Sequence, residues 1–291
     1  MHFAVEFVDK LLPELAGDCV VAAYRFRHAH GRLPRLLSPQ SFTEKVTYRM
    51  LFDRRSLLAQ FADKYAVRDY VAARLGEEVL PRLHHVTTDP ADLPFDALPP
   101  RFVVKPTHGS NWVRAVTDAP RLDRAELVAT CRAWLAQSYD RVWRERIYRT
   151  VVPRIIVEEY IDDGTGDLPI DYKFFVFDGR VALVQVVSER STGKKQTLYD
   201  PHWRRLPVTK RGLPAADDDL PRPAHLAEMM RVAEILGEGV DFVRVDLYDA
   251  CGRVLFGEMT ATPSAGLDGF DPPSFDAELG RLWTMPRRLR D

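Results

Sequence analysis

The hydrophobic period of this sequence changes from helical to strand-like near residue 100, which restricts the chain to folds that join helices to antiparallel sheets. Before the change, apolar residues recur at helical spacing in residues 3–26 and 61–75. The motif SFTE at Ser41 to Glu44 is a capping box and predicts the start of another helix. The first third is therefore expected to be mainly helical.

Residues 89–100 are rich in Pro and Asp, which interrupt helices and strands alike, and we place a domain boundary within them. Beyond the boundary, β-branched and aromatic runs between turn residues predict strands at 101–105, 112–116, 154–158, 174–177 and 181–187. Helices are predicted at 124–137 and 224–236. We expect an α+β fold, with a mainly helical N-terminal region at 1–100 and an α+β domain at 101–291.

Composition excludes several classes of protein. The 41 Lys+Arg and 42 Asp+Glu leave a formal charge of −1, so nucleic acid is not an expected partner. Cys19, Cys131 and Cys251 are far apart, which argues against a disulfide framework or a zinc ribbon. No segment approaches the ~20 apolar residues of a membrane helix, and the acidic start does not suit a secretory signal. We expect a cytoplasmic protein without a membrane span, whose oligomeric state the sequence does not indicate.

The strongest polar cluster lies on the last two predicted strands, at residues 242–248 and 253–259, which a short turn joins. By the strand period of two, Arg244 and Asp246 share one face, and Glu258 and Thr260 share one face of the partner strand. If the faces coincide, two carboxylates converge as oxygen ligands suited to Mg²⁺. The adjacent arginine suits an oxyanion or a phosphoryl group. An ion pair that only stabilises the hairpin explains the spacing equally well.

Other polar residues stand at the ends of predicted strands. Lys105 precedes a loop of small residues whose amides suit phosphate oxygens. Glu158 and Glu159 end a buried-looking strand and suit purine recognition. Asp171 and Lys173 share one face and suit ribose and phosphate. Each also has a simpler explanation, namely a solvated strand end or a cross-strand ion pair.

Taken in order, these segments resemble the ATP-grasp superfamily, and more closely its TupA-like branch, named for teichuronopeptide biosynthesis. Together the matching stretches cover the chain from about Ser41 to its end. They are SFTEKVTYRMLFDRR (41–55), ADKYAVRDYV (62–71), FVVKPTHGSNW (102–112), IIVEEYI (155–161), DYKFFVFDG (171–179) and FVRVDLYDACGRVLFGEMTATPSAG (242–266).

The resemblance implies an ATP-grasp fold, in which two α+β lobes clasp ATP under a glycine-rich flap. The ATP-binding residues that it implies are Lys105 at the α/β phosphates, His108, Gly109 and Ser110 in the flap, Glu158, Glu159, Tyr160 and Ile161 in the adenine hinge, Asp171 near the ribose and Lys173 near the β/γ phosphates. Asp246 and Glu258 are implied to hold Mg²⁺. Thr260 is a looser candidate, because many family members have Asn there. The catalytic residues expected are Arg244, which would steady the acyl phosphate, together with Lys173 and Arg190.

The activity that the resemblance implies is that of a carboxylate–amine ligase. The γ-phosphate of ATP activates a carboxylate, and an amine then attacks to form an amide or peptide bond with release of ADP and phosphate. The partners expected are an amine and a carboxylate on a small molecule, an amino acid, a uronate or a glycan.

Three other functions stay open. A glycosyltransferase would use the acidic run Asp217–Asp219, a kinase would pass phosphate to a hydroxyl, and a scaffold protein would keep the fold without the chemistry. Arg190 and the basic segments 193–197 and 203–205 suit an anionic substrate or a solvated edge equally. The loop Thr262–Gly266 suits close approach by a substrate or only a turn.

Overall fold

The computed structural model describes residues 17–164, 168–190, 193–287, 289 and 291. The α-helices are α2 (Asp18–His30), α3 (Phe42–Phe52), α4 (Ser56–Ala62), α5 (Val67–Leu75), α6 (Arg124–Leu135), α7 (Tyr139–Trp143), α8 (Leu226–Gly237) and α9 (Ser274–Leu282). The 3-10 helices are η1 (Pro90–Asp92), η2 (Ala119–Arg121), η3 (Arg146–Thr150) and η4 (Pro263–Gly266). The strands are β1 (Leu83–Thr87), β2 (Phe102–Pro106), β3 (Arg114–Val116), β4 (Ile155–Glu159), β5 (Asp171–Phe177), β6 (Arg180–Ser188), β7 (Lys195–Tyr199), β8 (Thr209–Lys210), β9 (Val243–Ala250), β10 (Arg253–Thr260) and β11 (Phe270–Asp271).

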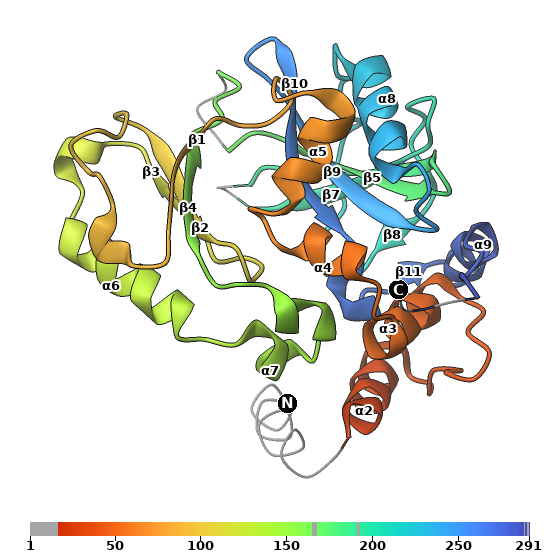
Figure 1. The fold of residues 1–291 in the computed structure, drawn as a ribbon. Helices are drawn as coiled ribbons and strands as arrows, with labels where there is room; N and C mark the ends of the chain where they lie inside the picture. Colours follow the sequence, from red (N-terminus) through yellow and green to blue (C-terminus); the bar gives the residue numbers. More distant parts are fainter. Residues whose placement is uncertain (1–16, 165–167, 191–192, 288, 290) are drawn as a thin grey trace.

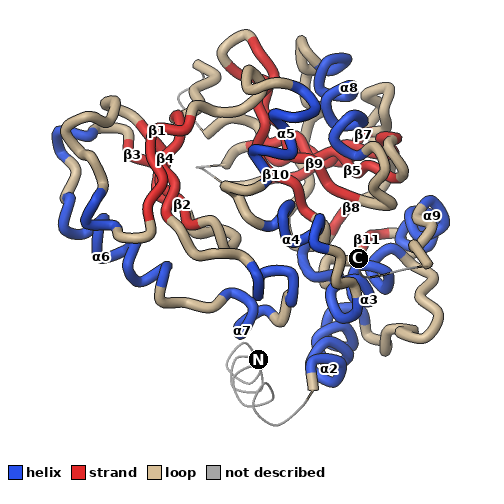
Figure 2. Tube along the Cα trace, in the orientation of Figure 1, coloured by secondary structure: helices blue, strands red, loops and turns tan. Residues whose placement is uncertain are grey.

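These strands form three antiparallel sheets. A four-stranded sheet has the order β1-β4-β2-β3, a five-stranded sheet has the order β10-β9-β5-β6-β7, and β11 pairs with β8. Figure 1 shows α6 beside the four-stranded sheet and α8 beside the five-stranded sheet. The strands of the two larger sheets form separate groups (Figure 2). The expected α+β class is confirmed.

Apolar cores cover both faces of the five-stranded sheet. On one face, Phe174 and Val176 of β5 pack with α8, whose buried Met229, Val232 and Leu236 recur at helical spacing. On the other face, Phe175 packs in a second core that includes residues of α3 and α9. Since side chains alternate along a strand, this second face also carries Lys173, which therefore lies beyond the edge of its apolar core.

The predicted capping box is present at the start of α3. The Ser41 hydroxyl accepts from the Glu44 amide at 3.4 Å, and the Glu44 carboxylate accepts from the Ser41 amide at 3.2 Å. The helix expected at residues 3–26 lies largely outside the described residues, and its described part belongs to α2. The single helix expected at residues 61–75 was wrong. It is interrupted because the Asp63 carboxylate accepts from the amides at 65 and 66.

The region before residue 100 contains a strand besides its helices, and the sequence pattern did not indicate that strand. β1 lies within it and pairs with β4, so that Val86 is opposite Ile156. The short sequence LHHVT has no clear alternation, which is why the pattern did not indicate a strand. The four-stranded sheet therefore begins before the expected boundary, and the division into two domains stays a prediction.

Two hairpins are present, β5 with β6 and the predicted pair β9 with β10. Each has two left-handed turn residues, Asp178 and Gly179 with φ of 48° and 73°, and Cys251 and Gly252 with φ of 56° and 71°. These backbone angles match the twist of paired strands. The Pro- and Asp-rich pattern of residues 206–223 predicts an exposed connection, but these residues contain β8, where Lys210 is 9% exposed.

Among the described residues, every helix is too short or too polar to cross a membrane.

Candidate active site

Arg244 holds the two carboxylates of the last hairpin together. Its guanidinium donates to both Asp246 oxygens at 2.7 Å, to Glu258 at 2.8 Å and to the Thr260 hydroxyl at 3.0 Å. Glu258 lies opposite Asp246 and Thr260 lies opposite Arg244. The two faces predicted from the sequence therefore coincide.

A β-bulge at Gly257 brings about this coincidence. From Arg253 to Phe256 the register is regular, and it then shifts by one residue before Glu258. Without the shift, Glu258 would follow Phe256 onto the apolar face, since side chains alternate along a strand. A Cβ atom at position 257 would lie 2.9 Å from the Asp246 carbonyl oxygen, so the bulge is built on a residue without one.

Lys173 joins this cluster from β5. Its Nζ lies 2.5 Å from Asp246 Oδ2 and 2.6 Å from Asp171 Oδ2. The face therefore carries three carboxylates and two cations. Burial lowers the pKa of Lys173, but Asp171 and Asp246 outweigh it and raise the pKa above its usual value. Burial likewise opposes ionisation of Glu258, but Arg244 and Lys173 lower its pKa to about 2.

Asp246 and Glu258 fit a Mg²⁺ ion. They face each other from neighbouring strands and offer hard oxygen donors, while the buried Oδ1 of Asp171 on the same face has no hydrogen-bond partner among the described residues. Within the described ranges, no group of three or more His, Cys, Asp or Glu is arranged as a metal site of its own. Such a pair suits an ion completed by substrate phosphates and water. Thr260 lies between Arg244 and Glu258, and its role as a ligand stays a prediction.

Lys105 and Glu158 form an ion pair between the two central strands of the four-stranded sheet, β2 and β4. Lys105 Nζ lies 2.5 Å from Glu158 Oε2, and Arg68 of α5 donates to Glu158 Oε1 at 2.8 Å. Of the simpler explanations, the cross-strand ion pair therefore applies to these two residues. Arg68, which the sequence did not indicate as a site residue, is therefore a second cationic partner of Glu158 in the predicted hinge.

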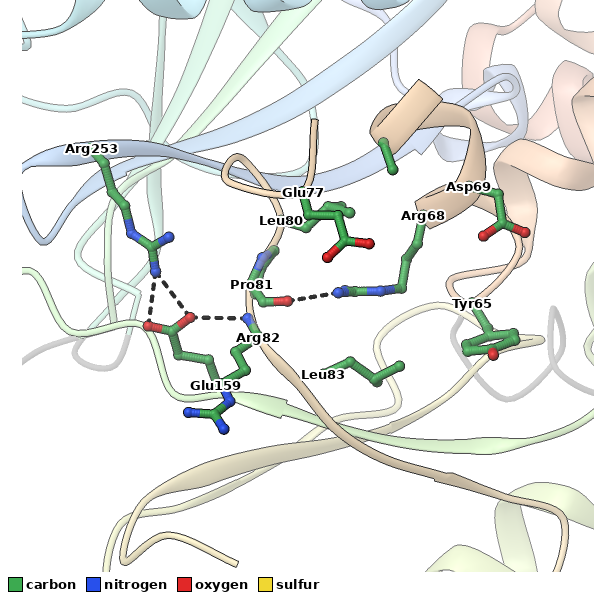
Figure 3. Close-up of a pocket in the computed structure, with 11 residues that line it drawn as sticks. Tyr65, Arg68, Asp69, Glu77, Leu80, Pro81, Arg82, Leu83, Glu159 and Arg253 are labelled. Carbon is green, nitrogen blue, oxygen red and sulfur yellow. Dashed lines mark hydrogen bonds and ion pairs between the residues drawn. The ribbon is translucent and has the colours of Figure 1, made fainter. Parts of the chain in front are cut away.

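The next hinge residue, Glu159, is oriented toward Arg253 (Figure 3). Its carboxylate accepts from the Arg253 guanidinium at 3.1 Å and from the Arg82 amide at 3.0 Å. It helps to line a cavity of about 510 Å³ beside α5. Tyr160 follows, with its ring 5.2 Å from the Arg101 guanidinium, and Ile161 is half-buried.

The predicted flap residues lie between β2 and β3. His108 is buried, with Nε2 3.2 Å from the Trp134 carbonyl oxygen. A Cβ atom at Gly109 would lie 2.5 Å from the Trp112 ring, so only glycine fits against this ring. Ser110 lies near the Tyr139 side chain. The flap therefore rests on aromatic side chains.

Lys64 binds the flap and was not assigned from the sequence. Its ammonium donates to the Gly109 carbonyl, and its amide donates to the Thr107 carbonyl at 3.3 Å. Burial lowers the pKa of Lys64 to about 8. Lys64 lies in the stretch ADKYAVRDYV, one of the segments that resemble the family. Its role could not be predicted from that stretch, because it depends on a contact with Gly109, 45 residues away.

The family model for TupA-like ATPgrasp matches residues 44–284. The chain belongs to the TupA-like ATPgrasp family. The family and the ATP-grasp fold expected from the sequence are thereby confirmed, and with them the assignment to the ATP-grasp enzymes. A search of curated proteins gave no match.

Several solved structures are similar to this TupA-like ATPgrasp protein. D-alanine–D-alanine ligase from Bacillus anthracis, complexed with ATP, has 16% identity and a TM-score of 0.41 over 71% of this chain and 56% of that chain. The ligase of the same name from Helicobacter pylori has 16% identity and a TM-score of 0.45 over 84% and 70%. The ATP-grasp ligase PsnB, complexed with a minimal precursor, has 17% identity and a TM-score of 0.36 over 70% and 52%. The chain thus spans about half the length of the first and last of these proteins.

Arg190 of this TupA-like ATPgrasp protein lies near Tyr248, on the face that carries Lys173 and Asp246. It donates to the Pro169 carbonyl at 2.9 Å, and its guanidinium lies 5.9 Å from the ring centre of Tyr248. Tyr248 shares the face of Asp246, because the two are two residues apart on β9. The catalytic role of Arg190 stays a prediction.

The acidic run Asp217–Asp219 is exposed and partly neutralised by nearby basic residues. Asp217 lies 2.8 Å from Lys195, and Asp219 lies 3.3 Å from Arg205. These ion pairs account for acidic and basic residues that the sequence left open as a metal or substrate site. Trp203 is similarly engaged, because its ring stacks on Tyr199 with centres 4.3 Å apart.

Gln185 is a further polar residue beside Lys173, and the sequence did not indicate it either. It lies opposite Lys173 on β6 and donates to Gln196 at 2.7 Å. Gln196 in turn donates to the carbonyls of Lys210 at 2.5 Å and Leu213 at 3.1 Å. These hydrogen bonds connect β8 and the loop after it to the five-stranded sheet.

Proposed function

We propose that this TupA-like ATPgrasp protein is an ATP-dependent carboxylate–amine ligase. It forms an amide or peptide bond through an acyl phosphate and releases ADP and phosphate. The observation that carries the proposal is the joint placement of Lys173, Arg244, Asp246 and Glu258 on one face of the five-stranded sheet. Buried cations beside paired carboxylates suit phosphoryl transfer, in which catalysis consists mainly of positioning and charge stabilisation.

In this proposal, ATP lies between the two larger sheets. Lys105 exchanges its contact with Glu158 for the α/β phosphates, and the flap residues His108, Gly109 and Ser110 cover them. The backbone of the hinge at 158–161 takes the adenine. The ribose lies at Asp171, whose Oδ1 accepts no hydrogen bond from the described residues and can accept one from a ribose hydroxyl. Lys173 holds the β/γ phosphates.

Asp246 and Glu258 would hold Mg²⁺, with Thr260 as a further candidate ligand. When bound, the ion neutralises charge on the transferring phosphates. Arg244 donates to both carboxylates, and its fork of N–H groups can equally hold an acyl phosphate and the oxyanion that forms when an amine attacks it. Arg190, at the border of this face, orients the carboxylate substrate.

The proposed carboxylate belongs to an amino acid, a uronate or a glycan. The use of ATP fits a cytoplasmic enzyme.

The test is a phosphorus NMR time course with Mg²⁺ and ATP. Uronates and N-acetylated amino acids serve as pooled carboxylates and amino-acid amides as pooled amines, with UDP-sugars in a parallel tube.

ADP and inorganic phosphate that form only when both pools are present would support the ligase. ADP with a new phosphate ester would replace it with a kinase. UDP release without ATP consumption would replace it with a glycosyltransferase.

A further inference from the structure

Glu145 is a buried acid to which the proposed reaction gives no role. It lies between α7 and η3 and is 7% exposed. Its Oε2 accepts from the Thr262 hydroxyl at 2.5 Å. Thr262 directly follows the hairpin of Asp246 and Glu258, so Glu145 borders the predicted metal residues without touching them.

The surroundings of Glu145 connect the flap with the hairpin. Tyr139 of α7 packs against Trp112, which follows the flap, with ring centres 5.7 Å apart, and its ring lies 4.6 Å from that of Tyr148. The Tyr148 amide donates to the Glu145 carbonyl at 3.1 Å. Glu145 and its neighbours therefore contact both the segment around the flap and the segment that follows the hairpin.

The charges around Glu145 do not neutralise it. Nearby acids have arginine partners, since Asp140 accepts from Arg149 at 2.8 Å and Asp18 accepts from Arg146 at 2.6 Å. Within the described part of the chain, no basic side chain forms an ion pair with Glu145. A buried carboxylate without a cation is costly, so a cation from a ligand would satisfy it.

The acidity of Glu145 agrees with such a role. Burial raises its pKa to about 7, while the Thr262 hydroxyl and Arg25 of α2 oppose this rise and the charges of Asp140 and Glu258 add to it. Tyr139 and Tyr148, which also lie near, have pKa values raised by burial and stay neutral. A group that gains and loses its proton near neutral pH is suited to general acid–base work.

We propose that Glu145 binds the amine of the acceptor substrate and takes the proton that this amine loses before it attacks. The inference rests on the proposed ligase function. The substrate ammonium transfers one proton to the Glu145 carboxylate, and the neutral nitrogen forms a C–N bond with the acyl carbon. The C–O bond to phosphate breaks, and the second proton of the nitrogen leaves with the phosphate as hydrogen phosphate. Glu145 returns its proton to water after product release.

Hydroxylamine separates this step from the rest of the reaction. It attacks acyl phosphates directly and is mainly uncharged at neutral pH, so it needs no base. The experiment measures hydroxamate formation with ATP, Mg²⁺, pooled carboxylates and hydroxylamine, and amide formation with pooled amino-acid amides as amines. In Glu145→Gln, hydroxamate formation should stay within about twofold of wild type, while amide formation should fall at least about 100-fold.

The outcomes distinguish the two proposals. If wild type forms neither hydroxamate nor amide with any pooled substrate, the ligase function itself is wrong. If wild type forms both and Glu145→Gln also forms both at normal rates, or loses both, Glu145 is not the acceptor site. A melting temperature near that of wild type is required of the variant.

Thr262→Val provides a second test that keeps the carboxylate. Loss of the hydroxyl donor disfavours the ionised form, so the acid limb of amide synthesis should move to higher pH while hydroxamate formation does not change. An unmoved limb would contradict the proposal. Asp140→Asn, which removes a neighbouring buried charge, is the matched control and should keep amide synthesis within about twofold.

Discussion

Lys173 on β5 and Asp246 on β9 lie opposite each other in register and form an ion pair, with 2.5 Å between Nζ and Oδ2. Asp246 is 1% exposed, and its burial raises its pKa. Without Lys173, the carboxylates of Asp171 and Asp246 would lie on one face with Arg244 as the remaining neighbouring cation. The same contact therefore supports both the local fold and the proposed phosphate site.

Lys173→Met is expected to reduce both activity and stability. Turnover of ATP should fall at least about 100-fold, because a cation that stabilises the transferring phosphoryl group is lost. The free energy of unfolding should fall by about 3–5 kcal/mol, because a buried charge loses its partner. ADP formation and urea unfolding measure the two effects.

Arg124→Met is the control for Lys173→Met. Arg124 forms an exposed ion pair with Asp96 at 2.7 Å, and its loss should change stability by less than about 1 kcal/mol and leave turnover unchanged. Normal turnover in Lys173→Met would contradict the phosphate assignment.

Glu258→Gln should abolish turnover and leave the fold intact. The side chain is 36% exposed, and glutamine still accepts the hydrogen bond from Arg244, so the melting temperature should stay near that of wild type. The loss of charge removes one ligand of the proposed Mg²⁺ site. Asp218→Asn should retain full activity. Turnover that survives in Glu258→Gln but disappears in Asp218→Asn would favour a glycosyltransferase.

The sequence predicted the hairpin but not the β-bulge that turns Glu258 toward Asp246. The strand period placed Arg244 with Asp246, and the turn at Cys251 and Gly252 fixed which strands pair. A regular register from that turn would have directed Glu258 into the apolar core. The bulge at Gly257 corrects its direction, and a bulge has no pattern of its own beyond a glycine within a strand.

Other site residues escaped prediction because their roles depend on contacts between distant segments. Lys64 binds a carbonyl of the flap, and Glu145 meets a hydroxyl that follows β10. Neither has a local pattern that distinguishes it from a solvated side chain. The family resemblance supplied the residues of β2, β4, β5, β9 and β10 because these lie in short ordered motifs.

Gly109→Ala should weaken ATP binding more than it affects the fold. The added Cβ would lie 2.5 Å from the Trp112 ring, which packs against Tyr139 with ring centres 5.7 Å apart. Either the flap or the ring must shift, and Lys64 then loses its acceptor at position 109. The KM for ATP should rise several-fold, as steady-state kinetics would measure.

A control separates this steric effect from a general loss of structure. The double variant Gly109→Ala with Trp112→Ala removes the obstructing ring and should recover part of the ATP affinity lost in Gly109→Ala. An unchanged KM in the single variant would show that the flap does not contact ATP.

Arg49→Met is expected to destabilise the protein without directly altering the site. The Arg49 side chain is fully buried on α3, forms an ion pair with Asp241 and donates to the Phe242 carbonyl at 2.7 Å. Its guanidinium lies 4.3 Å from the ring centre of Trp283. The variant should lose about 3–5 kcal/mol in urea unfolding, because Asp241 loses a buried partner. The added substitution Asp241→Asn should restore part of this loss, and a lack of restoration would contradict the ion-pair explanation.

Glu44 should make the stability of the protein sensitive to acid. Burial opposes its ionisation, but the Gln40 amide and the guanidinium groups of Arg32 and Arg35 lower its pKa from 4.5 to about 2. The stabilisation is therefore complete above pH 4.5 and is lost as the pH falls toward 2. Between pH 6 and pH 3 this loss should be about 2 kcal/mol in the free energy of unfolding. Glu44→Gln should lack this part of the pH dependence, whereas the exposed control Glu126→Gln should retain it. Equal pH dependence in wild type and Glu44→Gln would show that the capping box does not hold its carboxylate ionised.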